Sequence, residues 1–331
     1  MRAKVRVGLV GLGSNGSSFA EIYRGHPQVE LVAVADANPA RAEAAEGLGA
    51  VFYGSYDELV LLPELDVVSV HLPDRLHADA SLKALQAGKH VFVEKPMATT
   101  IGDCHKMIDA MDRTGLLVGV GQVLRTRPLY KRIKEIVDAG TLGTIYYCEG
   151  DYMVDELNRP ELATKVGPTY SLQGFQCSAT HPLDLLRWYL GNPVDVFAAG
   201  NNGLTHPGHL GDGFVAALYR WPGGCIGRVA GTWGCSYHHS YENAYGISLF
   251  GTKGTINRGS LILRENDNKP VEIARMKPGH PYEPEVVDFI DAVLTGRKPA
   301  VDARDGGNTS IAIIAALDAM DKSGWVTIPN R

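Results

Sequence analysis

The sequence predicts a mixed α/β protein with two domains, a doubly wound parallel sheet in residues 1–122 and an α+β domain in residues 123–331. In the first part, short Val- and Leu-rich strands alternate with helical stretches, which is typical of βαβ units and a parallel sheet. Beyond residue 123, several strands follow one another with turns but no helix between them, which favours a large, mostly antiparallel, open sheet. The length of 331 residues also exceeds what one ordinary core supports.

The composition is that of a globular protein, with 45% hydrophobic and 21% charged residues. A net charge of −5 and the lack of a Lys/Arg stripe argue against a nucleic-acid partner. The apolar opening "VRVGLVGLG" is too short to span a bilayer, so we expect no membrane partner. Five cysteines without a CxxC pair do not suggest a disulfide framework, and a cytoplasmic location is the simplest expectation.

A glycine-rich turn follows the first predicted strand, residues 5–10, and opens a helix. Gly11, Gly13 and Gly16 have the G-x-G-x-x-G spacing of dinucleotide-binding folds. In such a turn one glycine makes the bend, one lets pyrophosphate approach the backbone, and one lets the helix pack on the strand. The helix N-terminus then favours the phosphate charge. We therefore predict cofactor contacts from the whole turn, made up of Gly11, Leu12, Gly13, Ser14, Asn15 and Gly16.

The second predicted strand, residues 29–36, ends on Asp36, twenty residues after Gly16. In Rossmann domains an acid at this place accepts the adenosine ribose hydroxyls. A carboxylate also repels a 2′-phosphate, so Asp36 favours NAD over NADP as the cofactor. Arg41 lies five residues further on and keeps NADP open as an alternative.

Further predicted strands, residues 65–73, 89–96 and 116–121, alternate with helices at 77–89 and 100–114. Ligands of a doubly wound sheet bind at the carboxyl ends of its strands. We therefore expect these strand ends to line one crevice together with the glycine turn. The cofactor contacts predicted there are Leu72, Pro73, His77, Glu94 and Lys95.

The second domain has a different pattern. Helices are predicted at 128–139, 181–190, 284–295 and 304–322, and the last two are expected to pack back on the first domain. Strands are predicted at 144–154, 194–201, 212–221, 224–233, 245–250 and 254–264. Polar residues with Gly and Pro across 154–176 indicate an irregular loop.

The tripeptide Glu94-Lys95-Pro96 and the glycine turn resemble the Gfo/Idh/MocA family of oxidoreductases, named for glucose–fructose oxidoreductase and inositol dehydrogenase. Four further segments match the family in order along essentially the whole chain: "VHLPDRLH" (70–77), "VLRTRPLY" (123–130), "HPLDLLRWYLG" (181–191) and "GISLFGTKGTI" (246–256). The resemblance implies an NAD(H)-dependent enzyme acting on a secondary alcohol of a sugar, sugar derivative or cyclitol. It also implies a cis Lys95–Pro96 bond, no metal, and a homodimer or homotetramer formed through the open sheet.

The predicted chemistry needs a proton acceptor, because a hydride leaves an alcohol carbon as its hydroxyl loses a proton. A lysine can accept this proton when burial and the positively charged nicotinamide ring lower its pKa. Lys95 stands at a strand end, and the resemblance makes Lys95 and His181 the catalytic pair. His77 matches a family histidine near the nicotinamide, but a histidine in the first turn of a helix can equally well only pack locally. His71 is expected to be structural.

The predicted substrate side combines aromatic, basic and acidic residues, which suit a ligand with both CH faces and hydroxyls. Asp184 follows His181 by three residues on nearly the same helix face, so we expect it to hold His181 or a substrate hydroxyl. Arg125 is expected to shape the pocket and Tyr152 to line it. Further candidates are Tyr170, Trp233, Tyr237 and His238.

Cys177 marks a departure from the family, which usually has an Asp one turn before the histidine matched by His181. Cys177 is a substrate-side residue in the favoured interpretation, a small replacement in an active dehydrogenase with a changed pocket. Alternatively, it is a reactive thiol, or a metal ligand together with His181 and the "YHH" at 237–239, although the chain lacks convincing metal-ligand spacing. A third alternative is a chain that has lost turnover and only binds nucleotide and ligand, as a sensor or scaffold. An NAD-assisted redox cleavage of glycosides also stays open.

Overall fold

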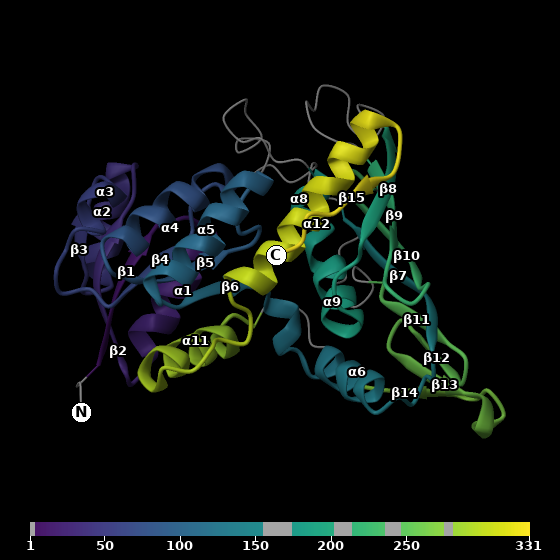
Figure 1. Ribbon diagram of the computed structural model, residues 1–331. Helices are drawn as coiled ribbons and strands as arrows, with labels where there is room; N and C mark the ends of the chain where they lie inside the picture. The colour runs from purple at the N-terminus through teal and green to yellow at the C-terminus, as the bar shows by residue number, and fades with distance from the viewer. Residues whose placement is uncertain (1–3, 155–173, 202–213, 236–245, 275–280) are drawn as a thin grey trace. The chain divides into compact units, whose positions relative to one another are not determined.

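The structure is a computed structural model, and its chain divides into two compact units. It describes residues 4–154, 174–201, 214–235, 246–274 and 281–331. The first unit comprises Met1–Val123 and Pro281–Gly307, and the second comprises Leu124–His280 and Asn308–Arg331. Each unit is described by itself below (Figure 1).

The first unit contains a six-stranded parallel sheet in the order β3-β2-β1-β4-β5-β6. The strands are β1 (Val5–Val10), β2 (Val29–Ala35), β3 (Val51–Tyr53), β4 (Val67–Val70), β5 (His90–Glu94) and β6 (Val118–Gly121). The order reverses between β1 and β4, which is the switch point where doubly wound sheets bind their ligands. The predicted doubly wound parallel sheet is therefore confirmed.

Helices cover both faces of this sheet (Figure 1). They are α1 (Ser14–Gly25), α2 (Ala42–Gly47), α3 (Tyr56–Leu59), α4 (His77–Gln86), α5 (Ile101–Thr114) and α11 (Glu283–Thr295). Helices α1 and α11 pack together, and α4 packs with α5. Because right-handed crossovers leave the switch point in opposite directions, α1 lies on one face and α4 and α5 on the other.

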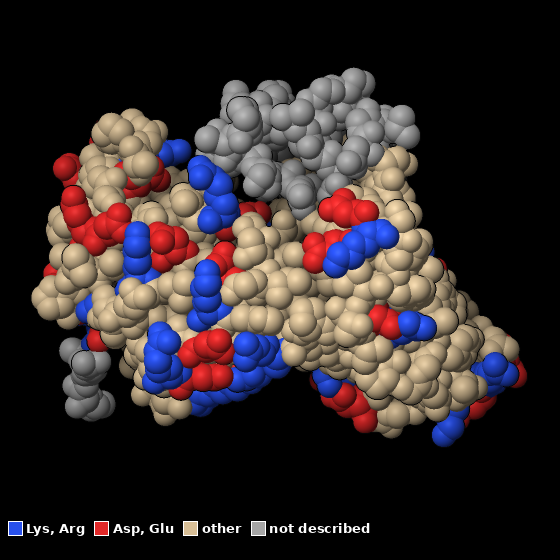
Figure 2. All heavy atoms as spheres, turned by 45° about the horizontal axis from the view of Figure 1, so that its top comes forward, with Lys and Arg blue, Asp and Glu red and all other residues tan. Residues whose placement is uncertain are grey.

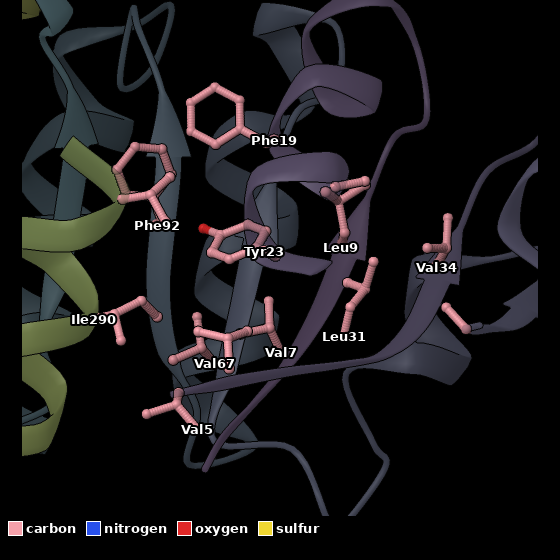
Figure 3. Close-up of a cluster of buried hydrophobic side chains, with 14 of the residues drawn as sticks. Val5, Val7, Leu9, Phe19, Tyr23, Leu31, Val34, Val67, Phe92 and Ile290 are labelled. Carbon is pink, nitrogen blue, oxygen red and sulfur yellow. The ribbon is translucent and has the colours of Figure 1, made fainter. Parts of the chain in front are cut away.

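The core of the first unit lies between its sheet and the α1–α11 pair (Figure 3). Tyr23 of α1 and Phe92 of β5 are both almost fully buried in it. The Phe92 ring meets Phe289 of α11 edge-on, with 5.6 Å between the ring centroids. Gly119 makes room for Phe289, because a Cβ there would lie 2.5 Å from that ring. The late segment that carries α11 thus completes the N-terminal core.

The second unit contains a nine-stranded sheet in the order β14-β13-β12-β11-β7-β10-β9-β8-β15. The strands are β7 (Ile145–Met153), β8 (Asp195–Asn201), β9 (Phe214–Arg220), β10 (Ile226–Thr232), β11 (Ser248–Gly251), β12 (Gly254–Asn257), β13 (Ser260–Leu263), β14 (Pro270–Glu272) and β15 (Val326–Thr327). Only β7 and β10 pair in parallel among these strands. The sheet is mostly antiparallel, as predicted.

One face of this sheet carries helices α8 (Gly174–Ser178) and α9 (Thr180–Leu190). Helix α6 (Pro128–Asp138) packs against α9, and α12 (Ala303–Lys322) belongs to this unit from Asn308 onward. Two strand glycines allow close packing. A Cβ on Gly150 would lie 2.7 Å from Pro182, and one on Gly231 would lie 2.7 Å from the Ser178 hydroxyl. The sheet therefore fixes where the helix carrying His181 begins.

Some predicted elements need correction. The strand predicted at 254–264 is two strands, β12 and β13, because Arg258 and Gly259 turn the chain with φ values of 45° and 92°. The loop predicted at 154–176 gives way to α8 at Gly174, while residues 155–173 lie outside the described part. The short elements α2, α3, β3, β14 and β15 were not predicted, since each is too short to carry a periodic pattern.

Acidic and basic side chains neighbour each other on the face drawn in Figure 2. Among the ion pairs of the first unit, Arg297 pairs with Asp288 and Asp291 at 2.8 Å each. Exposed pairs of this kind contribute little to stability. Within the described ranges, no helix combines the length and apolar character needed to cross a bilayer.

Candidate functional site

The glycine turn after β1 is built for close packing and for a ligand. Gly11 has φ +90°, and a Cβ there would lie 2.5 Å from the carbonyl oxygen of His71. A Cβ on Gly16 would lie 1.8 Å from the carbonyl oxygen of Gly11. Gly13 is different, because a Cβ there would meet no atom within 4 Å. Close packing within the fold therefore requires glycine at positions 11 and 16, whereas position 13 faces open space.

Helix α1 begins directly after Gly13 with an uncapped N-terminus. Gly13 offers no side-chain cap, and the first turn holds no acidic residue. Ser14 and Asn15, in that first turn, are exposed. The free N–H groups and the helix dipole together favour a bound anion such as pyrophosphate.

Asp36 is held in place beside this turn. Its Oδ2 accepts a hydrogen bond of 2.7 Å from the backbone N–H of Leu12, and its Oδ1 accepts one of 2.8 Å from that of Asn38. An ionised carboxylate keeps further lone pairs after these two bonds. Asp36 is only half-buried, so its remaining lone pairs can accept ribose hydroxyls, while Arg41 lies in an exposed 3₁₀ turn. The glycine turn and Asp36 are therefore suited to bind NAD.

Lys95 follows β5 at the same edge of the sheet. It is half-buried, and its bond to Pro96 is cis, as the resemblance implies. The backbone N–H of Lys95 donates to Oε2 of Glu94 over 3.1 Å. Burial raises the pKa of Glu94 to about 7, although the Lys95 charge opposes this rise. Burial, together with the Glu94 charge, also holds the pKa of Glu285 on α11 well above its usual range.

Two histidines lie in the segment after β4, His71 directly after the strand and His77 at the start of α4. His71 is buried, and its Nε2 shares a hydrogen bond of 2.7 Å with the Ser69 hydroxyl. Burial lowers the pKa of His71 to about 3, so it stays neutral, as expected of a structural histidine. His77 begins α4 and lies between two backbone carbonyls, those of Leu72 and Pro96, at 2.8 Å from each. Pro73 and Leu72 are half-buried next to it.

In the second unit, His181 lies in the first turn of α9. It is 4% exposed, and its ring stacks on that of Tyr152 from β7, with 5.8 Å between centroids. Cys177 is half-buried in α8, about one turn before His181. The structure therefore places the predicted catalytic His181 and two predicted substrate-side residues, Tyr152 and Cys177, within one unit.

Arg125 and Asp184, both predicted to lie on the substrate side, are bonded to each other. They form a buried two-pronged ion pair, with Nε to Oδ2 and Nη2 to Oδ1 both at 2.7 Å. Thr309 of α12 donates a further hydrogen bond of 2.9 Å to Asp184 Oδ1. Both Asp184 oxygens thus accept hydrogen bonds within the protein, and the role predicted for Asp184, to hold His181 or a substrate hydroxyl, stays a prediction. Sequence spacing did not single out Thr309, which is 125 residues away from Asp184.

The remaining candidates divide into two groups. Trp233 is buried at the end of β10. Tyr170, Tyr237 and His238 lie outside the described residues. Among the side chains that the structure describes, no group of three or more His, Cys, Asp or Glu residues is arranged to hold a metal ion.

The parallel sheet, the glycine turn and the fixed Asp36 define a dinucleotide-binding Rossmann protein. Residues 5–122 match the family described as "Oxidoreductase family, NAD-binding Rossmann fold", and residues 130–257 match the GFO/IDH/MocA C-terminal domain. The chain belongs to the Gfo/Idh/MocA oxidoreductase family. The predicted family, oxidoreductase class and NAD cofactor are thereby confirmed.

Relatives support this placement. An uncharacterized oxidoreductase of Streptococcus pneumoniae is 32% identical over 76% of this chain and 71% of its own. Inositol 2-dehydrogenase 3 of Saccharopolyspora erythraea is 36% identical over 57% of this chain and 55% of its own. A solved levoglucosan dehydrogenase in complex with NADH and levoglucosan has a TM-score of 0.86, with 23% identity over 99% of this chain and 100% of its own. At that identity the likeness shows a shared fold.

Proposed function

We propose that the protein transfers a hydride between NAD(H) and a secondary alcohol, or the matching ketone, of a sugar, sugar derivative or cyclitol. The position of Lys95 carries this proposal, because it follows β5 at the sheet edge that also bears the glycine turn and Asp36. Relatives named for inositol and levoglucosan oxidation support the substrate class. When bound, NAD supplies the hydride acceptor at its nicotinamide ring.

The chain's own residues then handle the hydroxyl proton. Lys95 Nζ takes this proton, and Glu94 holds the Lys95 backbone over 3.1 Å. We propose His181 as the second group that moves a proton, with its ring orientation set by the stacked Tyr152. Arg125 and Asp184 contribute indirectly, because their ion pair anchors α9 to the segment that begins the second unit.

Turnover can be tested with a panel of cyclitols, aldoses and anhydrosugars, followed by NADH absorbance. We expect oxidation of at least one panel member, lost in Lys95→Ala and kept in Lys106→Ala. Lys106 is a matched control because its side chain is 66% exposed on α5. Equal activity of both variants would contradict the role of Lys95.

A catalytically silent NAD sensor is the second candidate function. Cys177 favours it, because a thiol stands where the family usually has a carboxylate. Cys177→Asp separates the two functions: gained or redirected turnover indicates an enzyme with a changed pocket. NADH binding without turnover in either direction, in both the parent and Cys177→Asp, would support the sensor.

We further propose a homodimer or homotetramer through the sheet face opposite α8 and α9. Leu218 is 39% exposed, and Phe197 and Phe250 are half-buried. Alternation along the strands places these side chains opposite the helix-facing Val196, Tyr219 and Leu249. Sedimentation of the parent and of Leu218→Glu tests this proposal.

A reducing, cytoplasmic location is proposed from the five free cysteines.

A further inference from the structure

The side chain of His77 joins two loops at the carboxyl edge of the parallel sheet. Its Nδ1 lies 2.8 Å from the Pro96 carbonyl oxygen, and its Nε2 lies 2.8 Å from the Leu72 carbonyl oxygen. Leu72 belongs to the loop after β4 and Pro96 to the loop after β5. One imidazole ring therefore connects the ends of two neighbouring strands.

A carbonyl oxygen only accepts hydrogen bonds, so a ring nitrogen of His77 that carries a hydrogen donates to the carbonyl beside it. His77 is 1% exposed, so water cannot readily replace either bond. An apolar ring of similar size removes both polar contacts, and an Asn side chain reaches only one of the two carbonyls.

The two loops held by His77 are those that face the cofactor in the proposed function. A Cβ on Gly11 would lie 3.2 Å from the backbone nitrogen of Leu72, so the Leu72 loop packs directly against the glycine turn. Pro96 follows Lys95, and its carbonyl fixes the chain immediately after the proposed base. His77 therefore links the glycine turn, through Leu72, to Lys95.

Glu94 holds the other side of Lys95. Its Oε2 accepts the Lys95 backbone N–H over 3.1 Å. Its carboxyl group lies over β6, where a Cβ on Gly121 would be 3.2 Å from Oε2. Glu94 thus holds the chain at the Lys95 N–H, and His77 holds it at the Pro96 carbonyl.

We infer that His77 is a positioning residue, which ties the Leu72 and Pro96 carbonyls and so sets the place of Lys95 relative to the glycine turn. This inference rests on the proposed function for the role of Lys95. It differs from the sequence-based expectation of a direct cofactor contact, since both ring nitrogens are used within the protein. A loop displaced by about 1 Å can lower a catalysed rate by about 100-fold.

The test compares His77→Phe and His77→Asn with the parent by hydrogen–deuterium exchange of the protein without cofactor. In His77→Phe we expect exchange to rise about tenfold in peptides covering residues 70–76 and 95–100, and less in the rest of the unit. His77→Asn keeps one donor, so it is expected to protect one of the two loops. NADH affinity is expected to fall more in His77→Phe than in His77→Asn. With a substrate that the parent turns over, kcat is expected to fall in the same order.

Tyr23→Phe is the control for general loss of stability, because it removes a buried hydroxyl that bonds to Ser69 at 3.0 Å in the same unit. Equal exchange of the two loops in His77→Phe and Tyr23→Phe would overturn the inference. If the parent turns over no substrate, the proposed function fails, and the exchange result still decides whether His77 ties the loops.

Discussion

The backbone N–H of Leu12 donates a hydrogen bond of 2.7 Å to Oδ2 of Asp36, which joins the glycine turn to the end of β2. The bond spans 24 residues of sequence and fixes the acid beside the place where α1 begins. A second bond, from the Asn38 N–H, holds the other oxygen at 2.8 Å. Asp36 therefore presents a fixed negative charge to whatever binds at the turn.

Asp36→Ala is expected to weaken NADH binding about tenfold or more, because a charged hydrogen-bond acceptor for the ribose is lost. NADPH binding is expected to fall less or to improve, because the charge that repels a 2′-phosphate is also removed. Fluorescence titration of the variant with each cofactor measures both constants. Equal weakening of NADH and NADPH would show that Asp36 does not set the cofactor preference.

Gly13→Ala separates the needs of the ligand from those of the fold. A Cβ at this position meets no atom within 4 Å, and the φ of −77° suits any residue, so the thermal midpoint is expected to stay unchanged. NADH affinity is expected to fall, because the methyl group occupies the space through which pyrophosphate approaches. In contrast, Gly119→Ala is expected to lower stability by about 1–3 kcal/mol, because its Cβ would lie 2.5 Å from the Phe289 ring. Normal NADH affinity in Gly13→Ala would argue against pyrophosphate at this turn.

The Arg125–Asp184 pair is expected to act as one structural unit. Removing either partner leaves a buried charge, and this change typically costs about 3–5 kcal/mol of stability. Arg125→Leu and Asp184→Leu are each expected to be strongly destabilised, while the double variant is expected to lose less than the sum. Chemical denaturation of the four proteins measures this coupling. The exposed pair Arg220–Asp195 serves as the control, with an expected coupling of about 1 kcal/mol or less. Additive losses at Arg125 and Asp184 would contradict a coupled pair.

Stability should depend on pH through the buried acids Glu94 and Glu285. The folded pKa of Glu94 is raised to about 7, so the folded state holds a proton that the unfolded chain has already released. Stability from this group is therefore present below the unfolded pKa and is lost as pH rises toward 7. Glu285, whose pKa is also raised, acts with the same sign.

Glu285→Gln is expected to gain stability relative to the parent as pH rises from about 5 to about 8. Thermal midpoints across this range measure the difference. Glu283→Gln, an exposed position on the same helix, is the control and should follow the parent. Parallel pH curves for the parent and Glu285→Gln would mean that Glu285 is not a buried acid with a raised pKa.

Features that depend on local spacing could be predicted from the sequence. The glycine turn and Asp36 lie at set distances along the chain because they belong to one βαβ unit. The alternation of strands and helices likewise predicted the parallel sheet. Arg258 and Gly259 show the limit, because apolar residues on both sides of a tight turn gave the pattern of one long strand.

Contacts between distant segments could not be predicted in this way. Asp184 has its partners 59 and 125 residues away, at Arg125 and Thr309, whereas helix spacing considers only neighbours within one turn. His77 is the same kind of case, because its partner Pro96 lies 19 residues further on, in the loop after the next strand. A resemblance indicates that such residues matter, and the fold is needed to say what each one touches.

The most direct test of the central claim uses a sugar or cyclitol deuterated at its carbinol carbon, incubated with NAD+ and the protein. If the protein is an NAD-dependent dehydrogenase with Lys95 as the base, mass spectrometry will find the deuterium on the reduced nicotinamide. Lys95→Ala is then expected to abolish this transfer while still binding NADH. If the parent binds NADH but no deuterium reaches the nicotinamide with any member of the panel, the account is contradicted.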